Sequence, residues 1–225
     1  MSTQTVQERP DRPLRIALIG DSILDNKCYT AGEPSVCEHL NDILRDHGSA
    51  VNLAVDGSLT HQVAAQLERI PAGTTHVVLS SGGNDALQYE RLLSQPVGNT
   101  AEALALFRQP IDRFTRDYRK LHAAIADALP GLPVLTCTVY NGRYPQALAD
   151  STRVAIALFN DPIYAVAHEF SRPVLELRKV CTEGADYANP IEPSGSGGRK
   201  IARGIVRMLL QALSDMCKSD TQTEG

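Results

Sequence analysis

Five short apolar runs divide the chain, and each has the length and composition of a β-strand. They are rich in Val, Ile and Leu and almost continuously apolar, which is typical of strands covered on both faces. The runs span residues 15–19, 51–55, 76–80, 133–138 and 173–177. This pattern predicts a parallel sheet that is buried between two layers of helices.

The segments between the runs carry apolar residues at the three- and four-residue steps of amphipathic helices. The clearest stripe extends from Ile111 to Leu129, and Pro110 is placed to be the first residue of that helix. A second stripe covers 154–170, where Pro162 predicts a kink or a division. Further stripes cover 63–70 and 201–213. Alternating strands and helices predict an α/β fold with right-handed crossovers.

The two ends of the chain are polar and set the expected domain boundaries. Residues 1–12 predict a disordered N-terminal tail, and 214–225 predict a flexible C-terminal tail. The remainder, 13–213, contains no internal repeat or long linker, so we expect one domain. A chain of 225 residues with 43% hydrophobic residues buries a sufficient core without disulfides or metal.

Charge and cysteine content restrict the expected partners. A net charge of −4 provides no basic field for phosphates, so nucleic acid is not expected as a partner. The N-terminal residues lack the apolar stretch of a signal or anchor, and no run of roughly eighteen apolar residues predicts membrane insertion. Five cysteines without C-x-x-C spacing favour a reduced, cytoplasmic protein. No motif indicates a cofactor or metal, and the oligomeric state is not readable from the sequence.

Small polar motifs follow the first three apolar runs. Gly20-Asp21-Ser22 would place a hydroxyl and backbone N–H groups in a tight turn, which suits a serine nucleophile. Gly57 lies in the turn after the second run, and Asn84 follows Gly82-Gly83 after the third. A side-chain amide there can donate to a developing oxyanion. Alone, each motif is equally read as a helix cap or a turn. The carboxyl ends of parallel strands meet at one edge of the sheet, however, so the predicted fold brings all three motifs together.

Taken together, these motifs resemble the blocks of the GDSL, or SGNH, hydrolase family of lipases and esterases. Gly20-Asp21-Ser22-Ile23 stands for the first block, Gly57 for the second and Gly82-Gly83-Asn84-Asp85 for the third. The resemblance covers nearly all of 14–210 and implies a single three-layer α/β/α, flavodoxin-like domain with strand order 2-1-3-4-5. It also implies a Ser22 nucleophile that forms an acyl-enzyme. The implied oxyanion hole consists of the backbone N–H groups of Ser22 and Gly57 and the Asn84 side chain.

The last block departs from the family pattern, in which Asp-x-x-His-Pro supplies the general base and the carboxylate that orients it. Aligned on Pro193, Glu192 occupies the histidine position and Asn189 the aspartate position, and no histidine occurs beyond His168. A buried glutamate can have a pKa high enough to act as a base. We therefore expect Glu192 to be the base. Asp186 or Asp21 would raise its pKa, and the Asn189 amide would orient it.

A glutamate base led us to expect activity below pH 6, where a histidine base is lost. Two alternatives to that base remain. His61 or His168 would supply the base from elsewhere, although each is more simply an ordinary helix residue. Otherwise the protein is catalytically weak or inactive and binds an ester-like or carbohydrate-like ligand on a hydrolase scaffold.

The expected partner is a small-molecule ester. The absence of Trp and the 5% aromatic content give few residues for stacking on sugars, which favours small acyl esters. Natural substrate and acyl-chain length are otherwise not encoded in a recognisable motif.

Overall fold

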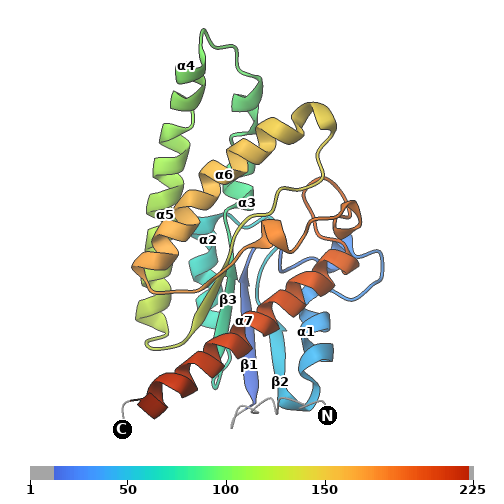
Figure 1. The fold of residues 1–225 in the computed structure, drawn as a ribbon, viewed down its shortest axis with the longest axis vertical. Coiled ribbons are helices and arrows are strands. Elements are labelled where there is room, and N and C mark those ends of the chain that lie inside the picture. Colours follow the sequence, from blue (N-terminus) through green and yellow to red (C-terminus); the bar gives the residue numbers. More distant parts are fainter. Residues whose placement is uncertain (1–12, 223–225) are drawn as a thin grey trace.

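A five-stranded, all-parallel sheet forms the centre of the computed structural model, which describes residues 13–222 (Figure 1). Its strands lie in the order β2-β1-β3-β4-β5, which confirms the predicted topology. The strands are β1 (Leu14–Gly20), β2 (Gly48–Asn52), β3 (His76–Ser80), β4 (Val134–Cys137) and β5 (Val174–Leu175).

Helices cover both faces of the sheet and complete the predicted three-layer α/β/α architecture. One layer contains α1 (Val36–Leu44) and α7 (Gly195–Gln222), which contact each other. The other contains α2 (Thr60–Val63), α5 (Arg108–Ala128) and α6 (Gln146–Glu169). Side chains of β1 alternate between the two cores, because successive residues of a strand point to opposite faces. Leu14, Ile16 and Leu18 join the α1/α7 core, whereas Ala17 and Ile19 join the other.

Two predicted helix details differ in the structure. Pro110 is the third residue of α5 rather than its first, which the first helical turn tolerates because its N–H groups have no partner inside the helix. The α6 helix begins at Gln146, well before the predicted stripe, and contains Pro162 without a break.

The second strand begins and ends earlier than its apolar run. The residues after β2 leave the regular ladder but remain bonded to β1: the N–H groups of Leu53 and Ala54 both donate to the Leu18 carbonyl, at 2.9 and 3.0 Å. The Val55 N–H then donates to the Gly20 carbonyl at 3.1 Å. The apolar run therefore continues along the end of β1, although only its first part is a strand.

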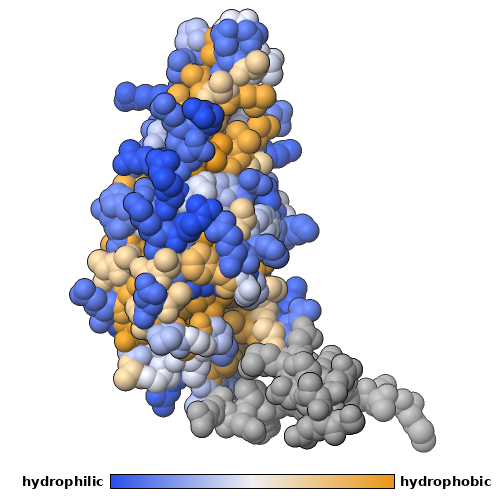
Figure 2. Space-filling model, turned by 90° about the vertical axis from the view of Figure 1, so that its left-hand side faces the viewer, coloured by the Kyte–Doolittle hydropathy of each residue, from blue (hydrophilic) through white to orange (hydrophobic). Residues whose placement is uncertain are grey.

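A segment between β3 and β5 rises above the carboxyl edge of the sheet. It includes α3 (Gly83–Leu87), α4 (Thr100–Ala105) and the first turns of α5 and α6 (Figure 1). Hydrophobic side chains gather on the upper part of the face shown in Figure 2. Exposed hydrophobic residues of this upper segment include Val97 and Leu104.

At the ends of the chain, the predicted boundaries are only partly described. The helix α7 continues to Gln222, so the boundary predicted at residue 213 falls inside a helix. Residues 1–12, where a disordered tail was predicted, lie outside the described residues. Within residues 13–222, no helix has the length and apolar character to cross a membrane.

Candidate active site

The end of β1 holds Ser22 at the carboxyl edge of the sheet. Gly20 has a φ of +131°, and a Cβ there would lie 1.7 Å from the Ser80 carbonyl oxygen of β3, so no larger residue fits. The next N–H, of Asp21, donates to that same carbonyl at 3.1 Å. The turn is thereby fixed against β3, and Ser22, which is only 6% exposed, follows immediately.

A second residue, which sequence reasoning missed, holds the same turn from the other side. The side-chain amide of Gln66 accepts from the Gly20 N–H at 2.7 Å and donates to the Gly20 carbonyl at 2.9 Å. It also donates to the Ser58 hydroxyl at 3.4 Å. The available signal was a polar residue three positions after Val63, on the apolar stripe of a predicted helix.

The turns after β2 and β3 meet beside the nucleophile. The Asn84 side chain donates to the Ser58 carbonyl at 3.1 Å, and both Asn84 and Ser22 line one cavity. Gly57 has a φ of +78° and precedes that carbonyl in the chain, but it is not among the residues that line the cavity. The structure thus brings Asn84 to the cavity of Ser22 and leaves Gly57 at its border.

Asp85 fastens these two turns together. Its carboxylate accepts from the Thr60 N–H at 3.0 Å and from the Thr60 hydroxyl at 2.8 Å. Because Thr60 begins α2 and Asp85 lies in α3, this pair fixes the turn after β2 relative to the turn after β3.

The loop before α7 brings Glu192 to the same cavity. The Asn189 Oδ1 accepts from the N–H groups of Ile191 and Glu192, both at 2.9 Å. Glu192 is 6% exposed, and its Oε2 has no hydrogen-bond partner within residues 13–222. Asn189 therefore holds the backbone of Glu192 rather than its carboxylate, which is left free for other contacts.

Burial raises the pKa of Glu192 to about 7, and the nearby charge of Asp56 acts in the same direction. Hydrogen bonding with the Ser22 hydroxyl opposes this rise, as expected for a hydroxyl that faces the carboxylate. This raised pKa argues against activity below pH 6. A base with this pKa is protonated as the pH falls through about 7, much as imidazole is.

Asp21 is the second buried carboxyl group of the site. Burial raises its pKa to about 7, against hydrogen bonds from the Ile23 N–H and the Ser80 hydroxyl, and the charge of Glu192 adds to the rise. Its Oδ1 accepts those two bonds at 3.2 Å each, whereas Oδ2 has no partner among the described residues. Asp21 and Glu192 thus both line the cavity of Ser22 with a free oxygen.

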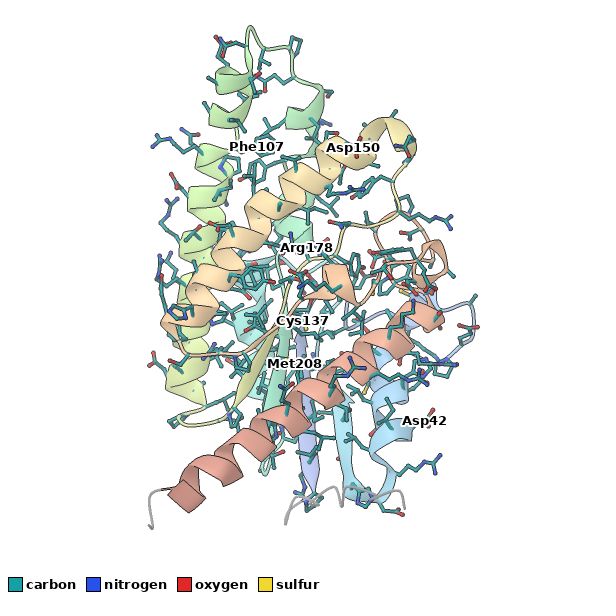
Figure 3. The ribbon with its side chains drawn as sticks, in the orientation of Figure 1. Asp42, Phe107, Cys137, Asp150, Arg178 and Met208 are labelled. Atoms are coloured by element: carbon teal, nitrogen blue, oxygen red, sulfur yellow. The ribbon has the colours of Figure 1, made fainter. Side chains whose placement is uncertain are left out.

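This cavity has a volume of about 370 Å³ and extends from the sheet edge into the upper segment. Four polar residues at its base come from the strand ends and the loop before α7: Asp21, Ser22, Asn84 and Glu192. Its walls are mostly apolar and include Leu87, Leu93, Phe107, Ile156 and Phe159. Phe107 lies high above the sheet, whereas Cys137 lies at the end of β4 in the sheet itself (Figure 3).

A family model that describes the GDSL-like lipase/acylhydrolase family matches residues 18–199. The chain belongs to this family. A GDSL-type protein of this kind is a hydrolase that acts on ester bonds. No curated protein sequence matches the chain significantly.

Solved structures share the fold of this GDSL-type hydrolase at low sequence identity. The lipase Lip_vut3 from a goat rumen metagenome is 17% identical, with a TM-score of 0.65 over 86% of this chain and 96% of that one. The lipase/acylhydrolase from Enterococcus faecalis is 18% identical, with a TM-score of 0.62 over 88% and 96%. The acetyl xylan esterase AlAXEase is 15% identical, with a TM-score of 0.63 over 87% and 99%.

None of the six histidines of this GDSL-type hydrolase, all within the described residues, lines the cavity of Ser22. His61 is exposed and borders a separate, smaller pocket, and His168 is exposed near the end of α6. The buried His39 instead pairs with the Gly195 carbonyl at 3.0 Å. The two histidines considered as alternative bases are therefore not placed for that role.

Asp186, the other expected support for Glu192, has a different role in the GDSL-type fold. Its side chain is fully buried, with Oδ1 2.8 Å from the Lys200 ammonium and Oδ2 accepting from that group at 3.0 Å. It also accepts from the Glu183 N–H at 2.9 Å, and it does not line the cavity. Asp186 thus connects its loop to α7, and Asp21 is the carboxyl group that faces the site.

Proposed function

We propose that the protein hydrolyses a carboxylic ester through an acyl-enzyme on Ser22, with Glu192 as the general base. The observation that carries this proposal is the pairing of the two residues at the base of one apolar cavity. Hydrogen bonding with the Ser22 hydroxyl lowers the pKa of Glu192, the Glu192 Oε2 has no partner among the described residues, and no histidine lines the cavity. A carboxyl group with a pKa of about 7 is matched to proton transfer near neutral pH.

In the proposed reaction, the Ser22 oxygen attacks the ester carbonyl carbon while its proton passes to Glu192. The carbonyl oxygen becomes an oxyanion that the N–H groups of Ser22 and Gly57 and the Asn84 amide stabilise. An amide nitrogen carries two N–H donors, so Asn84 retains one after bonding to Ser58. Glu192 then returns the proton to the leaving alkoxide, and water releases the acid by the same two transfers.

Asp21 is a second acid beside the proposed base, although the charge that raises the pKa of Glu192 is that of Asp56. Its carboxyl group is fully buried beside the nucleophile, and its pKa rises with the charge of Glu192. Ionised carboxylates on both Asp21 and Glu192 would repel each other in this buried site, so one of the two retains a proton near Ser22 at neutral pH.

The cytoplasmic location stays a prediction from the sequence.

The nucleophile is tested with Ser22→Ala and a fluorophosphonate probe, which reacts with activated serines. We expect the wild-type protein to be labelled and to hydrolyse p-nitrophenyl esters, and the variant to lose labelling and at least about 10³-fold in kcat/KM. Ser49→Ala is a control, because that serine of β2 is exposed and is not among the residues that line the cavity. Labelling that survives in Ser22→Ala would reject Ser22 as the nucleophile.

A further inference from the structure

We propose that this enzyme is selective for esters of medium-length fatty acids with a small alcohol that carries no negative charge, and that the acyl chain, not the alcohol, occupies the cavity. This inference rests on the proposed function and adds the substrate class. Three observations support it: the composition of the cavity wall, its volume, and the contrast between the two sides of Glu192.

The cavity wall is suited to a hydrocarbon chain along its length. Above the four polar residues at its base, side chains from α3, α6 and the segment before α5 form the wall. Leu87, Phe159 and Phe107 represent these elements, and the polar residues that line the upper part, Glu90, Arg91 and Ser94, are exposed. Apart from the buried Thr152, an apolar ligand meets mainly apolar and aromatic groups inside, with charged groups confined to the base and the rim.

The volume of the cavity sets the length of the chain. At roughly 30 Å³ for each water-sized group, about 370 Å³ accommodates about twelve groups, which corresponds to an acyl chain of about eight to twelve carbons. An acetyl group would leave most of this apolar surface uncovered. The proposed substrate thus differs from the small acyl esters that the low aromatic content favours.

Glu192 lies between an apolar cavity on one side and charged residues on the other, which suits the acyl chain and the alcohol of an ester, respectively. The leaving oxygen must lie near Glu192 to receive its proton. Beyond Glu192, away from the cavity, lie Asp56, whose charge affects the pKa of Glu192, and Tyr29, whose hydroxyl donates to Asp56 at 2.7 Å. Neither residue lines the cavity, and Asp56 is exposed.

This outer side is polar, negatively charged and open. Asp25 lies there too and accepts from the Asp56 N–H at 3.0 Å. Carboxylates on this side repel an anionic leaving group, and a long hydrocarbon chain gains more from the apolar cavity wall than from this charged side. The alcohol therefore leaves through the polar side, and the acyl chain points into the cavity.

The test uses two isomeric esters, ethyl decanoate and decyl acetate, which have the same atoms and similar hydrophobicity but reversed halves. Hydrolysis of each is followed by acid release at monomeric concentrations, with ethyl acetate as the short reference. We expect kcat/KM for ethyl decanoate to exceed that for decyl acetate by at least about 100-fold, because each buried methylene contributes roughly fourfold.

Ala155→Phe narrows the cavity, and Ala157→Phe is the matched control, because Ala155 lines the cavity and Ala157 is exposed on the same helix. We expect Ala155→Phe to lower the ratio of kcat/KM for ethyl decanoate to kcat/KM for ethyl acetate at least about tenfold. We expect Ala157→Phe to leave this ratio unchanged. Ile156→Ala enlarges the cavity and should move the preference to longer acyl chains. It decides the question if Ala155→Phe does not fold.

Other outcomes overturn the proposal in distinguishable ways. Faster hydrolysis of decyl acetate would place the alcohol in the cavity. If ethyl acetate is the best substrate and fluorophosphonate still labels Ser22, the proposed selectivity for medium-length acyl chains is wrong. The proposed hydrolysis through Ser22 then still holds. If no ester is hydrolysed and Ser22 is not labelled, the proposed function itself fails, and the selectivity with it.

Discussion

Asp186 and Glu192 lie at the two ends of one loop, and both carboxyl groups are buried, but only one is neutralised. Asp186 has the ammonium of Lys200 at 2.8 Å and a backbone N–H at 2.9 Å. Glu192 has a backbone fixed by Asn189 and a carboxylate oxygen without a partner. The fold thus places a cation against one buried acid and none against the other, which lies beside Ser22, where a base without a counter-charge can accept a proton.

A neighbouring cation distinguishes the structural carboxylate from the proposed catalytic one. A buried charge with a matched cation connects parts of the fold, and its removal mainly affects stability. A buried carboxyl group without one has a raised pKa, destabilises the folded state when charged, and persists where chemistry needs it.

The largest expected effect is on catalysis at the unpaired end. Glu192→Gln retains the shape of the side chain but cannot accept a proton, so we expect kcat/KM for ester hydrolysis to fall by about 10²–10⁴-fold. Glu183→Gln, in the same loop with a side chain that is 70% exposed, should retain wild-type activity. Equal activity of the two variants would contradict a catalytic role for Glu192.

The next effect is on stability at the neutralised end. Lys200→Met removes the cation and leaves the fully buried Asp186 charged, so we expect the free energy of unfolding to fall by about 3 kcal/mol in urea denaturation. In the double variant with Asp186→Asn, much of the loss should be restored, because no buried charge remains. A Lys200→Met variant as stable as the wild type would show that the pair contributes nothing.

The smallest effect has the opposite sign and depends on pH. Folding raises the pKa of Glu192 from 4.5 to about 7, so its contribution to stability is fully present below pH 4.5 and is lost as the pH rises to about 7. Glutamine does not titrate. Between pH 5 and pH 8, Glu192→Gln should therefore gain about 2 kcal/mol of stability relative to the wild type. An advantage that does not change with pH would argue against the raised pKa.

Much of the fold was predictable, because continuous apolar runs specify buried parallel strands wherever they occur. The exception is the second run: the residues after Asn52 pack along β1 but leave the ladder where two N–H groups share the Leu18 carbonyl. Apolar character reports burial, and the sequence does not show which buried residues keep a regular hydrogen-bond register.

The site was predictable as far as it depends on strand ends. Ser22 and Asn84 follow β1 and β3, which are adjacent, so a parallel sheet brings them together. The role of Asp186 was not predictable, because spacing places it near Glu192 in the chain but does not reveal that Lys200 of α7 faces it. Gln66 was missed for the same reason, since its partner is 46 positions away. The contribution of the Gly57 N–H stays a prediction.

The Gln66 side chain also has a consequence for the edge of the sheet. Strand β2 ends at Asn52, opposite Leu18 in the ladder, so β1 extends beyond its neighbour on that side. A primary amide offers the same donor and acceptor as a peptide group, and Gln66 presents both to Gly20, as a neighbouring strand would. Together with the Val55 N–H, which also donates to the Gly20 carbonyl, this side chain supplies the neighbour that β2 no longer provides, so the residue that precedes Asp21 and Ser22 is held from both sides.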